Sequence, residues 1–387
     1  MKKTLLAAAL LTGFAGAASA QNSVTLYGVV SVGMKYQSIT SPDGTQFDGG
    51  KTSLSRFEME SGQQSGSRWG LKGVEDLGNG LKASFVYESG VNVTNGSSTG
   101  FTRQATLALD SNSWGGFQFG RAMSPGTVAF SGIDPFGASF GTSSLTSSQG
   151  NTFVRYSNMI QYSTPNMSGF KGLFGYSFNP AVSSNSAGNG FETNNKNRVA
   201  SAGLRYANGP ILVAGIFDYM YSNDLNPAES VTDTNIKSWT VGGTFDFKVA
   251  KVHGSYGQNI DGILGSSDLD ANILSDDGPT NAASGALFYK GARTQSWMLG
   301  LSAPVGAAGK VFAGVQQRIA GGDFDENIVL EDGTTIETAT MTTASIGYTY
   351  GFSKRTNLYA YYSYQQNVSN LKGADSNMVG VGLRHLF

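Results

Sequence analysis

The sequence predicts an all-β fold: a closed antiparallel barrel of about sixteen strands that crosses a membrane. Three observations carry this prediction. Stretches of roughly ten residues alternate apolar with small or polar side chains, and their connections alternate between short turns and long polar loops. Charged residues make up 14% of the chain, whereas soluble proteins average roughly 25%. A chain with so little charge to place on its outside is not expected to face water there.

The first twenty residues have the composition of a removable secretory signal. Lys2 and Lys3 give a basic start, a short apolar run follows, and residues 18–20, Ala-Ser-Ala, form a small-residue cleavage site. A membrane anchor, the alternative, would need about 20 apolar residues. We therefore expect a signal peptide at residues 1–20 and one barrel domain at residues 21–387.

The strand pattern is clearest near the C-terminus. Residues 342–350 place Ala344, Ile346, Tyr348 and Tyr350 on one face and small or polar side chains on the other. Because side chains alternate across a strand, this pattern predicts two unlike faces. Many apolar faces end in an aromatic residue, which predicts aromatic girdles at two membrane interfaces. The same pattern recurs at residues 26–32, 170–178, 239–247 and 357–364.

Seven short turns and eight long loops connect the strands, which is the expected rhythm of a bacterial single-chain barrel. The short turns fall at residues 76–80, 111–116, 166–169, 208–210, 248–250, 305–309 and 352–355. The long loops fall around residues 38–52, 92–100, 122–151, 179–195, 222–235, 260–292, 320–340 and 366–375.

The membrane setting follows from hydrogen bonding. In hydrocarbon every backbone N–H and C=O needs a partner within the protein, so strands cross only as a closed barrel with an apolar outside. About sixteen strands enclose a lumen too wide for side chains to fill, which predicts an aqueous channel.

The third long loop, residues 122–151, is the best candidate to narrow such a channel. Its centre is a compact aromatic turn, which we expect to fold inward; a loop exposed on the surface is the alternative. The turn consists of Asp134, Pro135, Phe136 and Gly137.

Residues 66–83, GSRWGLKGVEDLGNGLKA, resemble the general-diffusion porins of Gram-negative bacteria, especially the betaproteobacterial branch. Four further segments are similar to the same family and follow its order along the chain. They are residues 23–30 (SVTLYGVV), 119–121 (FGR), 155–158 (RYSN) and 381–387 (VGLRHLF).

The resemblance implies a homotrimeric, sixteen-stranded outer-membrane barrel whose third loop constricts each pore. It implies passive diffusion of ions and small hydrophilic solutes, and contact with outer-membrane lipid and lipopolysaccharide. It also implies that the terminal Phe387 belongs to the signal read by the barrel-assembly machinery. An ordinary interface aromatic is the other interpretation of Phe387, and both can hold together.

Fixed charges beside a narrow water column would set the selectivity of such a pore. Arg68 alternates with the apolar Trp69 and Leu71, and Arg155 alternates with Val154 and Tyr156, so both arginines are expected to face the lumen.

The family pattern carries over Arg68, Arg103 and Arg155 as a basic wall, with Arg121 as an addition at the start of the third loop. Arg103 is open to two interpretations, because plain alternation groups it with Leu107 and would turn it outward.

One acid is expected to face these arginines. Asp134 is the only acid in residues 122–151, and one carboxylate against several arginines predicts a weak to moderate anion preference. Glu58, Glu60 and Glu88 also have lumen parity and would oppose that preference. Alternatively, each of these charges is simply solvated and has no effect on selectivity.

Other chemistries have little support. The chain has no cysteine and two histidines, so disulfides, thiolate metal sites, transition-metal sites and a catalytic triad are not expected, and neither is a cofactor. A net charge of −1 gives no basic surface of the kind that binds nucleic acid.

Two alternatives to a passive channel are a barrel enzyme, such as an outer-membrane lipase or protease, and an adhesin or receptor that acts through its surface loops. Stepwise currents in a planar bilayer would separate the channel from both.

Overall fold

The computed structural model describes residues 23–46, 50–152, 154–180, 198–221, 235–264, 286–322, 328–329 and 335–387. The signal peptide expected at residues 1–20 lies outside these residues, as does most of the expected loops around residues 179–195, 222–235 and 260–292.

Strands make up most of the described chain, with a few short helical turns. The strands are β1 (Ser23–Thr40), β2 (Ser53–Ser61), β3 (Arg68–Gly78), β4 (Leu81–Gly90), β5 (Gln104–Ser111), β6 (Gly115–Met123), β7 (Arg155–Ser163), β8 (Phe170–Ser177), β9 (Arg198–Asn208), β10 (Ile211–Tyr221), β11 (Ile236–Asp246), β12 (Lys251–Leu264), β13 (Ala286–Val305), β14 (Gly309–Gly322), β15 (Ile328–Val329), β16 (Thr335–Ile336), β17 (Met341–Gly351), β18 (Thr356–Gln366) and β19 (Ser376–Leu386). The helical segments are α2 (Pro125–Phe130), η2 (Gly141–Ser143), η3 (Leu145–Ser147), η4 (Gly150–Thr152) and η7 (Val368–Asn370).

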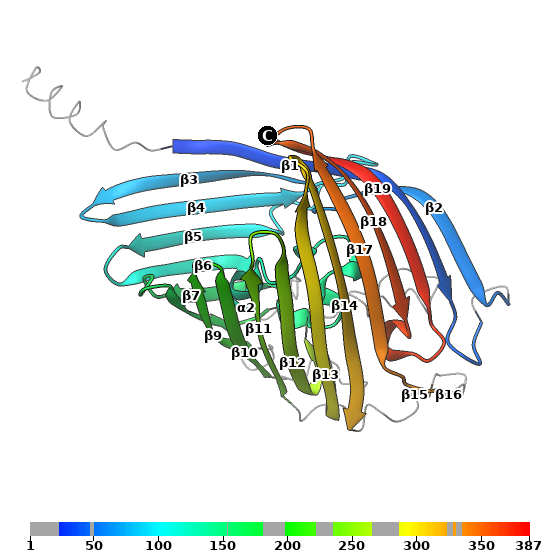
Figure 1. Cartoon of the computed structure of the whole chain (residues 1–387). Helices are drawn as coiled ribbons and strands as arrows, with labels where there is room; N and C mark the ends of the chain where they lie inside the picture. The colour runs from blue at the N-terminus through cyan, green and yellow to red at the C-terminus, as the bar shows by residue number, and fades with distance from the viewer. Residues whose placement is uncertain are drawn as a thin grey trace, which may run out of the picture.

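The main sheet closes on itself (Figure 1). Each strand pairs antiparallel with its neighbour, β14 pairs with β17, and β19 returns to β1. β2 and β3 lie end to end along the same edge of β1, so the 17 strands of this sheet occupy sixteen barrel positions. The predicted sixteen-stranded antiparallel barrel is therefore confirmed. β15 and β16 form a separate two-stranded hairpin.

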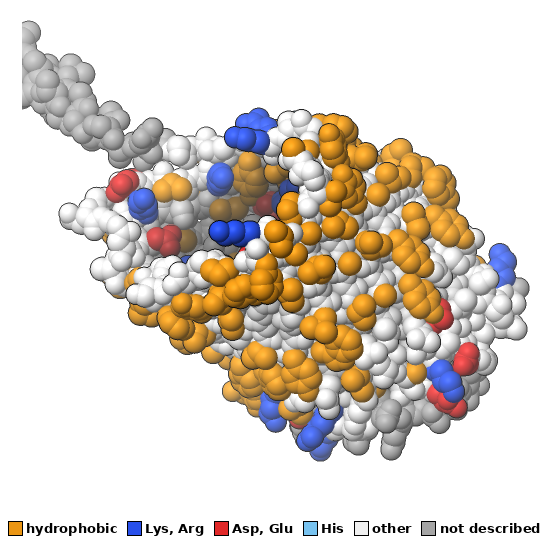
Figure 2. Space-filling view, in the orientation of Figure 1, with side chains coloured by type: hydrophobic (Ala, Val, Ile, Leu, Met, Phe, Trp, Pro, Cys, Tyr) orange, Lys and Arg blue, Asp and Glu red, His pale blue; other side chains and the backbone are white. Residues whose placement is uncertain are grey.

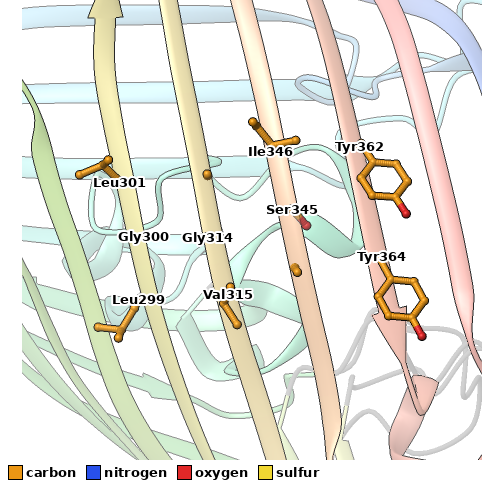
Figure 3. Close-up of a pocket in the computed structure, with 11 residues that line it drawn as sticks. Leu299, Gly300, Leu301, Gly314, Val315, Ser345, Ile346, Tyr362 and Tyr364 are labelled. Atoms are coloured by element: carbon orange, nitrogen blue, oxygen red, sulfur yellow. The ribbon is translucent and has the colours of Figure 1, made fainter.

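The wall has an apolar outside. Leu299 is 62% exposed, whereas its neighbour Met298 is 3% exposed and packs in the interior. Figure 2 shows hydrophobic side chains over the outer wall and charged side chains inside the hollow at one end. On that outer wall, Leu299, Val315 and Ile346 border a shallow apolar hollow (Figure 3). Aromatic pairs cap the band near both kinds of connection, such as Phe245 with Phe247 and Tyr219 with Tyr221.

All seven predicted short turns join consecutive strands. The turn between β3 and β4 shows why its sequence is needed, because Gly78, Asn79 and Gly80 have φ values of 83°, 52° and 75°. Glycine and asparagine adopt this left-handed region with the least strain. No helix in the described part of the chain is long and apolar enough to cross a bilayer.

Helix α2 was not predicted, although its first turn carries a recognisable signal. The side chain of Ser124 accepts a hydrogen bond from the backbone N–H of Thr127, and Pro125 opens the helix. The helix has only six residues, too few for helical periodicity to be seen in the sequence.

Candidate functional site

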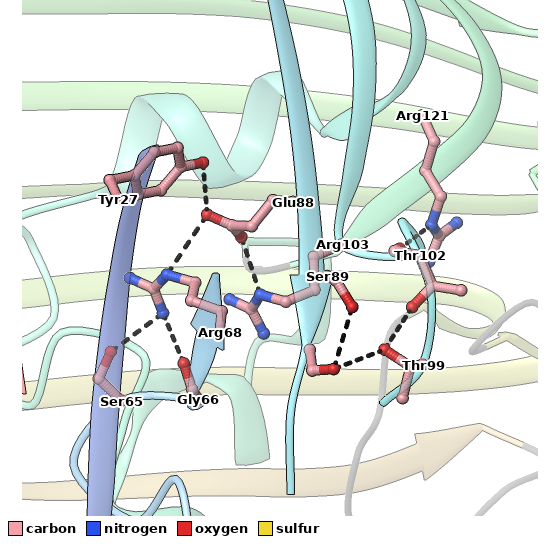
Figure 4. Close-up of polar contacts among 11 residues, drawn as sticks. Tyr27, Ser65, Gly66, Arg68, Glu88, Ser89, Thr99, Thr102, Arg103 and Arg121 are labelled. Atoms are coloured by element: carbon pink, nitrogen blue, oxygen red, sulfur yellow. Dashed lines mark hydrogen bonds and ion pairs between the residues drawn. The ribbon is translucent and has the colours of Figure 1, made fainter. Parts of the chain in front are cut away.

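One glutamate lies between two arginines on the inner wall (Figure 4). Arg68 places its Nε 3.3 Å from Glu88 Oε2, and Arg103 places its Nε 2.8 Å from Glu88 Oε1. Tyr27 of β1 donates its hydroxyl to Glu88 Oε2 at 3.0 Å. Glu88 is only 4% exposed, so this carboxylate is fully engaged and holds the two guanidinium groups beside each other.

Arg103 faces inward, which settles the orientation that alternation left open. Leu107, which has the same parity, is 60% exposed on the outer face. Strict alternation fails for Arg103 because β5 begins one residue later, at Gln104, so the pleat does not fix this side chain.

Arg155 joins the same part of the interior, although the argument that placed it there had a wrong premise. Its charge interacts with those of Arg103, Glu88, Arg121 and Arg68. Tyr156, however, does not face outward as expected; it is 2% exposed in an inner cluster. The pairing of β6 with β7 shifts register here, so simple alternation does not apply.

Arg121 does not reach the carboxylate of Glu88, but its charge interacts with that of Arg155. In the β5–β6 ladder it lies opposite Ala105, on the face of the outward Phe119. Its Nε donates to the backbone carbonyl of Thr102 and its Nη1 to Ser157 Oγ at 2.9 Å. Arg121 lies at a bulge between β6 and β7, and its hydrogen bonds tie together the ends of neighbouring strands.

Arg384 was missed as a site residue. It lies in β19 next to the outward Leu383 and is paired in register with the fully buried Ser31. Its charge interacts with that of Arg68. Lumen parity would have found it, because the alternating residues of the last strand are regular. We call Arg68, Arg103, Arg155 and Arg384 the arginine cluster. Among the described residues, Glu88 is the only acid ion-paired with it.

Asp134 does not face the arginine cluster, which corrects the expectation that it supplies the opposing charge. It is 4% exposed and has no ion pair among the described residues. Its Oδ1 accepts the N–H of Phe136 at 2.9 Å, and its Oδ2 accepts the N–H groups of Ala138 and Leu145 at 2.8 and 3.0 Å. Aspartate readily binds nearby backbone N–H groups in this way. Burial raises its pKa to about 6, although these three hydrogen bonds act in the opposite direction.

The third loop lies inside the barrel, where α2 is visible in Figure 1. Phe136 and Phe140 of the loop lie 5.1 and 5.3 Å, by ring centroids, from the inward Phe312 of β14. Phe140 also lies 5.2 Å from Tyr361 of β18. A second cluster joins the loop to β8, β10 and β13; it comprises Ala129, Phe130, Ile133, Leu145, Leu173, Ala214, Ile216 and Met298.

The other two residues of the predicted aromatic turn have structural roles. Pro135 packs against β13, where a Cβ added at Gly300 would lie 2.7 Å from Pro135 Cγ. Gly137 has a φ of 64°, which lets the chain reverse after Phe136.

Polar contacts fasten the loop at several points. Asn151 Nδ2 donates to Asp218 Oδ2 at 3.2 Å. Arg318 Nη1 donates to the carbonyl of Ser147 at 3.0 Å, and its Nε donates to Asn370 Oδ1 at 2.6 Å. Asn370 belongs to the last long loop, so Arg318 joins two loops inside the barrel.

The other two acids with lumen parity are already paired. Lys35 Nζ lies 3.3 Å from Glu58 Oε1 and 2.8 Å from Glu60 Oε1, and Arg56 Nε lies 3.1 Å from Glu58 Oε1. Lys35, Arg56 and Glu60 line a cavity of about 730 Å³ that reaches Gly66 beside the arginine cluster. Two cations and two acids balance one another there.

The histidines make ordinary contacts. His253 Nδ1 lies 2.7 Å from the carbonyl oxygen of Ile133, and its Nε2 lies 3.0 Å from Ser302 Oγ, so this ring also holds the third loop. Within the described residues there is no group of three His, Asp or Glu side chains that could hold a metal ion.

Comparisons with known proteins agree with this architecture. A family model described as Gram-negative porin matches residues 7–370. An outer membrane porin protein of Bordetella pertussis is 43% identical, with all of both chains covered. Outer membrane porin protein 32 of Delftia acidovorans is 29% identical and covers 100% of this chain and 94% of its own. The solved structure of an anion-selective porin from Comamonas acidovorans is similar, with a TM-score of 0.67, 26% identity, and coverage of 95% of this chain and 100% of that chain.

Proposed function

Because the chain belongs to the Gram-negative porin family, we propose that the arginine cluster makes its channel prefer anions. The protein is a barrel of the outer membrane that provides a water-filled path for ions and small hydrophilic solutes. The proposal adds the sign of the preferred ion and the residues that set it.

The charge balance of the inner wall carries the proposal. Four guanidinium groups interact there with one another or with a single carboxylate, Glu88. Arginine stays charged at any physiological pH, and a net positive charge beside a confined water column raises the local concentration of anions. The acids that would oppose this preference, Glu58 and Glu60, are paired with Lys35. The similar porin from Comamonas acidovorans is anion-selective, which supports the same sign.

The test is the reversal potential of the purified protein in a planar bilayer under a salt gradient. We expect stepwise currents with anion preference, and Arg155→Gln should lower the anion-to-cation permeability ratio about twofold. Arg355→Gln is the matched control, because Arg355 lies in the exposed turn between β17 and β18. A cation-preferring wild-type channel would refute the proposal, and the absence of current would favour an enzyme or a receptor.

We also propose a homotrimer that is assembled from a precursor by removal of residues 1–20. The contact of Phe387 with β1 supports a role for this residue in assembly. Its N–H donates to the carbonyl of Gly28 at 3.1 Å, and the N–H of Gly28 donates back at 3.0 Å, where the barrel closes. We propose in addition that the protein contacts the barrel-assembly machinery and lipopolysaccharide, and that it has no catalytic activity.

A further inference from the structure

Six residues between β2 and β3 leave the wall of the barrel. Val32 of β1 pairs with Ser61, and Val29 pairs with Arg68, so two residues would suffice to continue the ladder where residues 62–67 stand. We call residues 62–67 the inner strap. Its excess of four residues is even, so the alternation of faces in β3 is the same as if the ladder were continuous.

The inner strap crosses the interior. The carbonyl of Gln63 accepts the N–H of Phe140, in the third loop, at 2.7 Å. Gln64 Oε1 accepts a hydrogen bond from Asn357 Nδ2 of β18 at 2.7 Å. Because β19 and β1 lie between β18 and the β2–β3 position, this contact is made across the inside of the barrel.

The gap in the ladder is closed by side-chain and backbone hydrogen bonds. Ser67 Oγ accepts the N–H of Ser31 at 3.0 Å and donates to the carbonyl of Ser31 at 2.9 Å. The N–H of Gly62 donates to the same carbonyl at 2.7 Å. The strap therefore leaves no open ladder groups on Ser31, which would be costly within a bilayer.

The middle of the strap contacts two members of the arginine cluster, Arg68 and Arg103. Arg68 Nη1 donates to Ser65 Oγ at 3.1 Å and to the carbonyl of Gly66 at 2.8 Å (Figure 4). A Cβ added at Gly66 would lie 2.9 Å from Arg103 Nη1, so the guanidinium of Arg103 rests against this glycine. The strap thus contacts both arginines that bind Glu88, on the side away from the carboxylate.

We propose that the inner strap is a second selectivity element of the channel. It positions the guanidinium groups of Arg68 and Arg103 and anchors the tip of the third loop through Gln63. It also occupies part of the lumen beside the 730 Å³ cavity, which it lines with Gly62, Gln63 and Gly66. This inference rests on the anion preference proposed above, and Ser65, Gly66 and Gln63 are positioning residues in it.

Deletion of residues 63–66 is the direct test. The two remaining residues of the strap can continue the ladder in register, so we expect the barrel to fold. We expect higher single-channel conductance, because a segment leaves the lumen. We also expect an anion-to-cation permeability ratio lowered about twofold, because Arg68 Nη1 loses both of its acceptors in the strap. A folded deletion variant with unchanged conductance and selectivity would overturn the proposal.

Gly66→Ala decides the question if the deletion variant does not fold. The added methyl group meets the flexible end of Arg103, so the wall should stay intact while the guanidinium moves away from the strap. We expect a lowered permeability ratio at unchanged heat stability of the assembled protein. Gly254→Ala is the matched control, because a Cβ there meets its first neighbour, the outward-facing Leu299, at 3.6 Å.

The outcomes separate this inference from the proposed function. A wild-type channel without anion preference would refute the proposed function, on which this inference rests. An anion-preferring wild type whose Gly66→Ala variant has the same reversal potential removes the strap's role alone. Ser65→Ala should shift the ratio in the same direction, and Ser65→Thr, which keeps the hydroxyl, should restore it.

Discussion

Glu88 is the residue whose charge most directly limits the anion preference of the wall. Glu88→Gln keeps the shape of the side chain and removes the one carboxylate paired with the arginine cluster. We expect the anion-to-cation permeability ratio to rise about twofold, because the net positive charge beside the same water column increases by one. Reversal potentials in a salt gradient measure this change.

Glu58→Gln is the matched control for Glu88→Gln. It removes the same charge from the network of Lys35 and Arg56, where Glu60 stays as a partner. A smaller shift is expected for this variant. Equal shifts from both variants would mean that total lumen charge, and not its position beside the cluster, determines selectivity.

The raised pKa of Asp134 predicts that the stability of the third loop depends on pH. Its pKa is about 6 in the folded loop and 3.8 when the loop opens, so its contribution is full below about pH 4 and is lost as the pH rises through 6. The closed loop should be about 1–2 kcal/mol more stable at pH 5 than at pH 7.5. Hydrogen exchange of the Phe136, Ala138 and Leu145 amides, corrected for intrinsic rates, measures this difference.

Asp134→Asn should abolish that pH dependence while leaving ion selectivity unchanged, since the side chain does not face the arginine cluster. At pH 5 the wild-type carboxyl group is mostly protonated and, like the amide, offers one carbonyl oxygen to the three N–H donors, so the two proteins should exchange at similar rates there. A clear increase in anion preference in this variant would show that Asp134 is felt in the lumen after all.

Residue positions were predictable wherever strands are regular. Arg68 lies inside the barrel as its parity indicated. Alternation could not place Arg103 or Arg121, because one lies just before a strand and the other lies at a bulge, and neither feature leaves a mark in an alternating pattern. Asp134 was misassigned because a charge in a loop does not reveal whether it faces water or its own backbone.

At the scale of elements, the position of the third loop depends on the close packing of Pro135 against a glycine of β13, Gly300. Gly300→Ala would place a Cβ 2.7 Å from Cγ of Pro135, whose rigid ring cannot move aside as a flexible side chain does. We expect the loop to be displaced at a cost of about 1–3 kcal/mol. Higher or noisier single-channel conductance, with normal assembly, is the expected result.

Gly314→Ala is the graded comparison for Gly300→Ala. The same proline lies 3.6 Å from a Cβ at Gly314, and that distance is an ordinary contact. The loop should therefore keep its place in this variant, and conductance should match the wild type. If both variants conduct alike, Pro135 does not fix the position of the loop.

The elements that the sequence did not reveal are those whose partners are distant along the chain. Short turns were predictable because their residues carry the local backbone requirement. The inner strap was not, because the expected loop at residues 38–52 and turn at residues 76–80 leave residues 62–67 within a single strand. Only their contacts with Phe140 and Asn357 show that they turn inward. The last long loop is similar, since its burial depends on Arg318, about fifty residues earlier in the chain.

For the whole molecule, the closure of the sheet into a barrel and its apolar outer face were predictable from the sequence, because both follow from constraints on any strand that crosses a membrane. A membrane admits strands only without free edges, and the period of two assigns each side chain to a face. The wall must also accommodate interior segments, and it does so with small residues at points of contact, such as Gly300 against Pro135 and Gly242 against Phe130. Those points are fixed by packing across the lumen, which alternation along one strand does not record.

The apolar outer face of the barrel predicts that a charge placed on it will destabilise the protein. Leu299→Arg would place a charge on the outer face of β13, within the hollow bordered by Val315 and Ile346 (Figure 3). We expect a loss of about 2–4 kcal/mol in folding free energy, because a guanidinium near the bilayer midplane loses its hydration. Reversible unfolding by urea in lipid vesicles measures this loss.

Gln118→Arg introduces the same side chain on the inner face of β6, between the outward Phe117 and Phe119. Water in the lumen can hydrate that charge, so the folding free energy should change little while anion preference increases. The two variants thus separate the faces by different observables, stability for one and selectivity for the other. If Leu299→Arg were as stable as Gln118→Arg in vesicles but altered the reversal potential, the outer and inner faces would have been assigned the wrong way round.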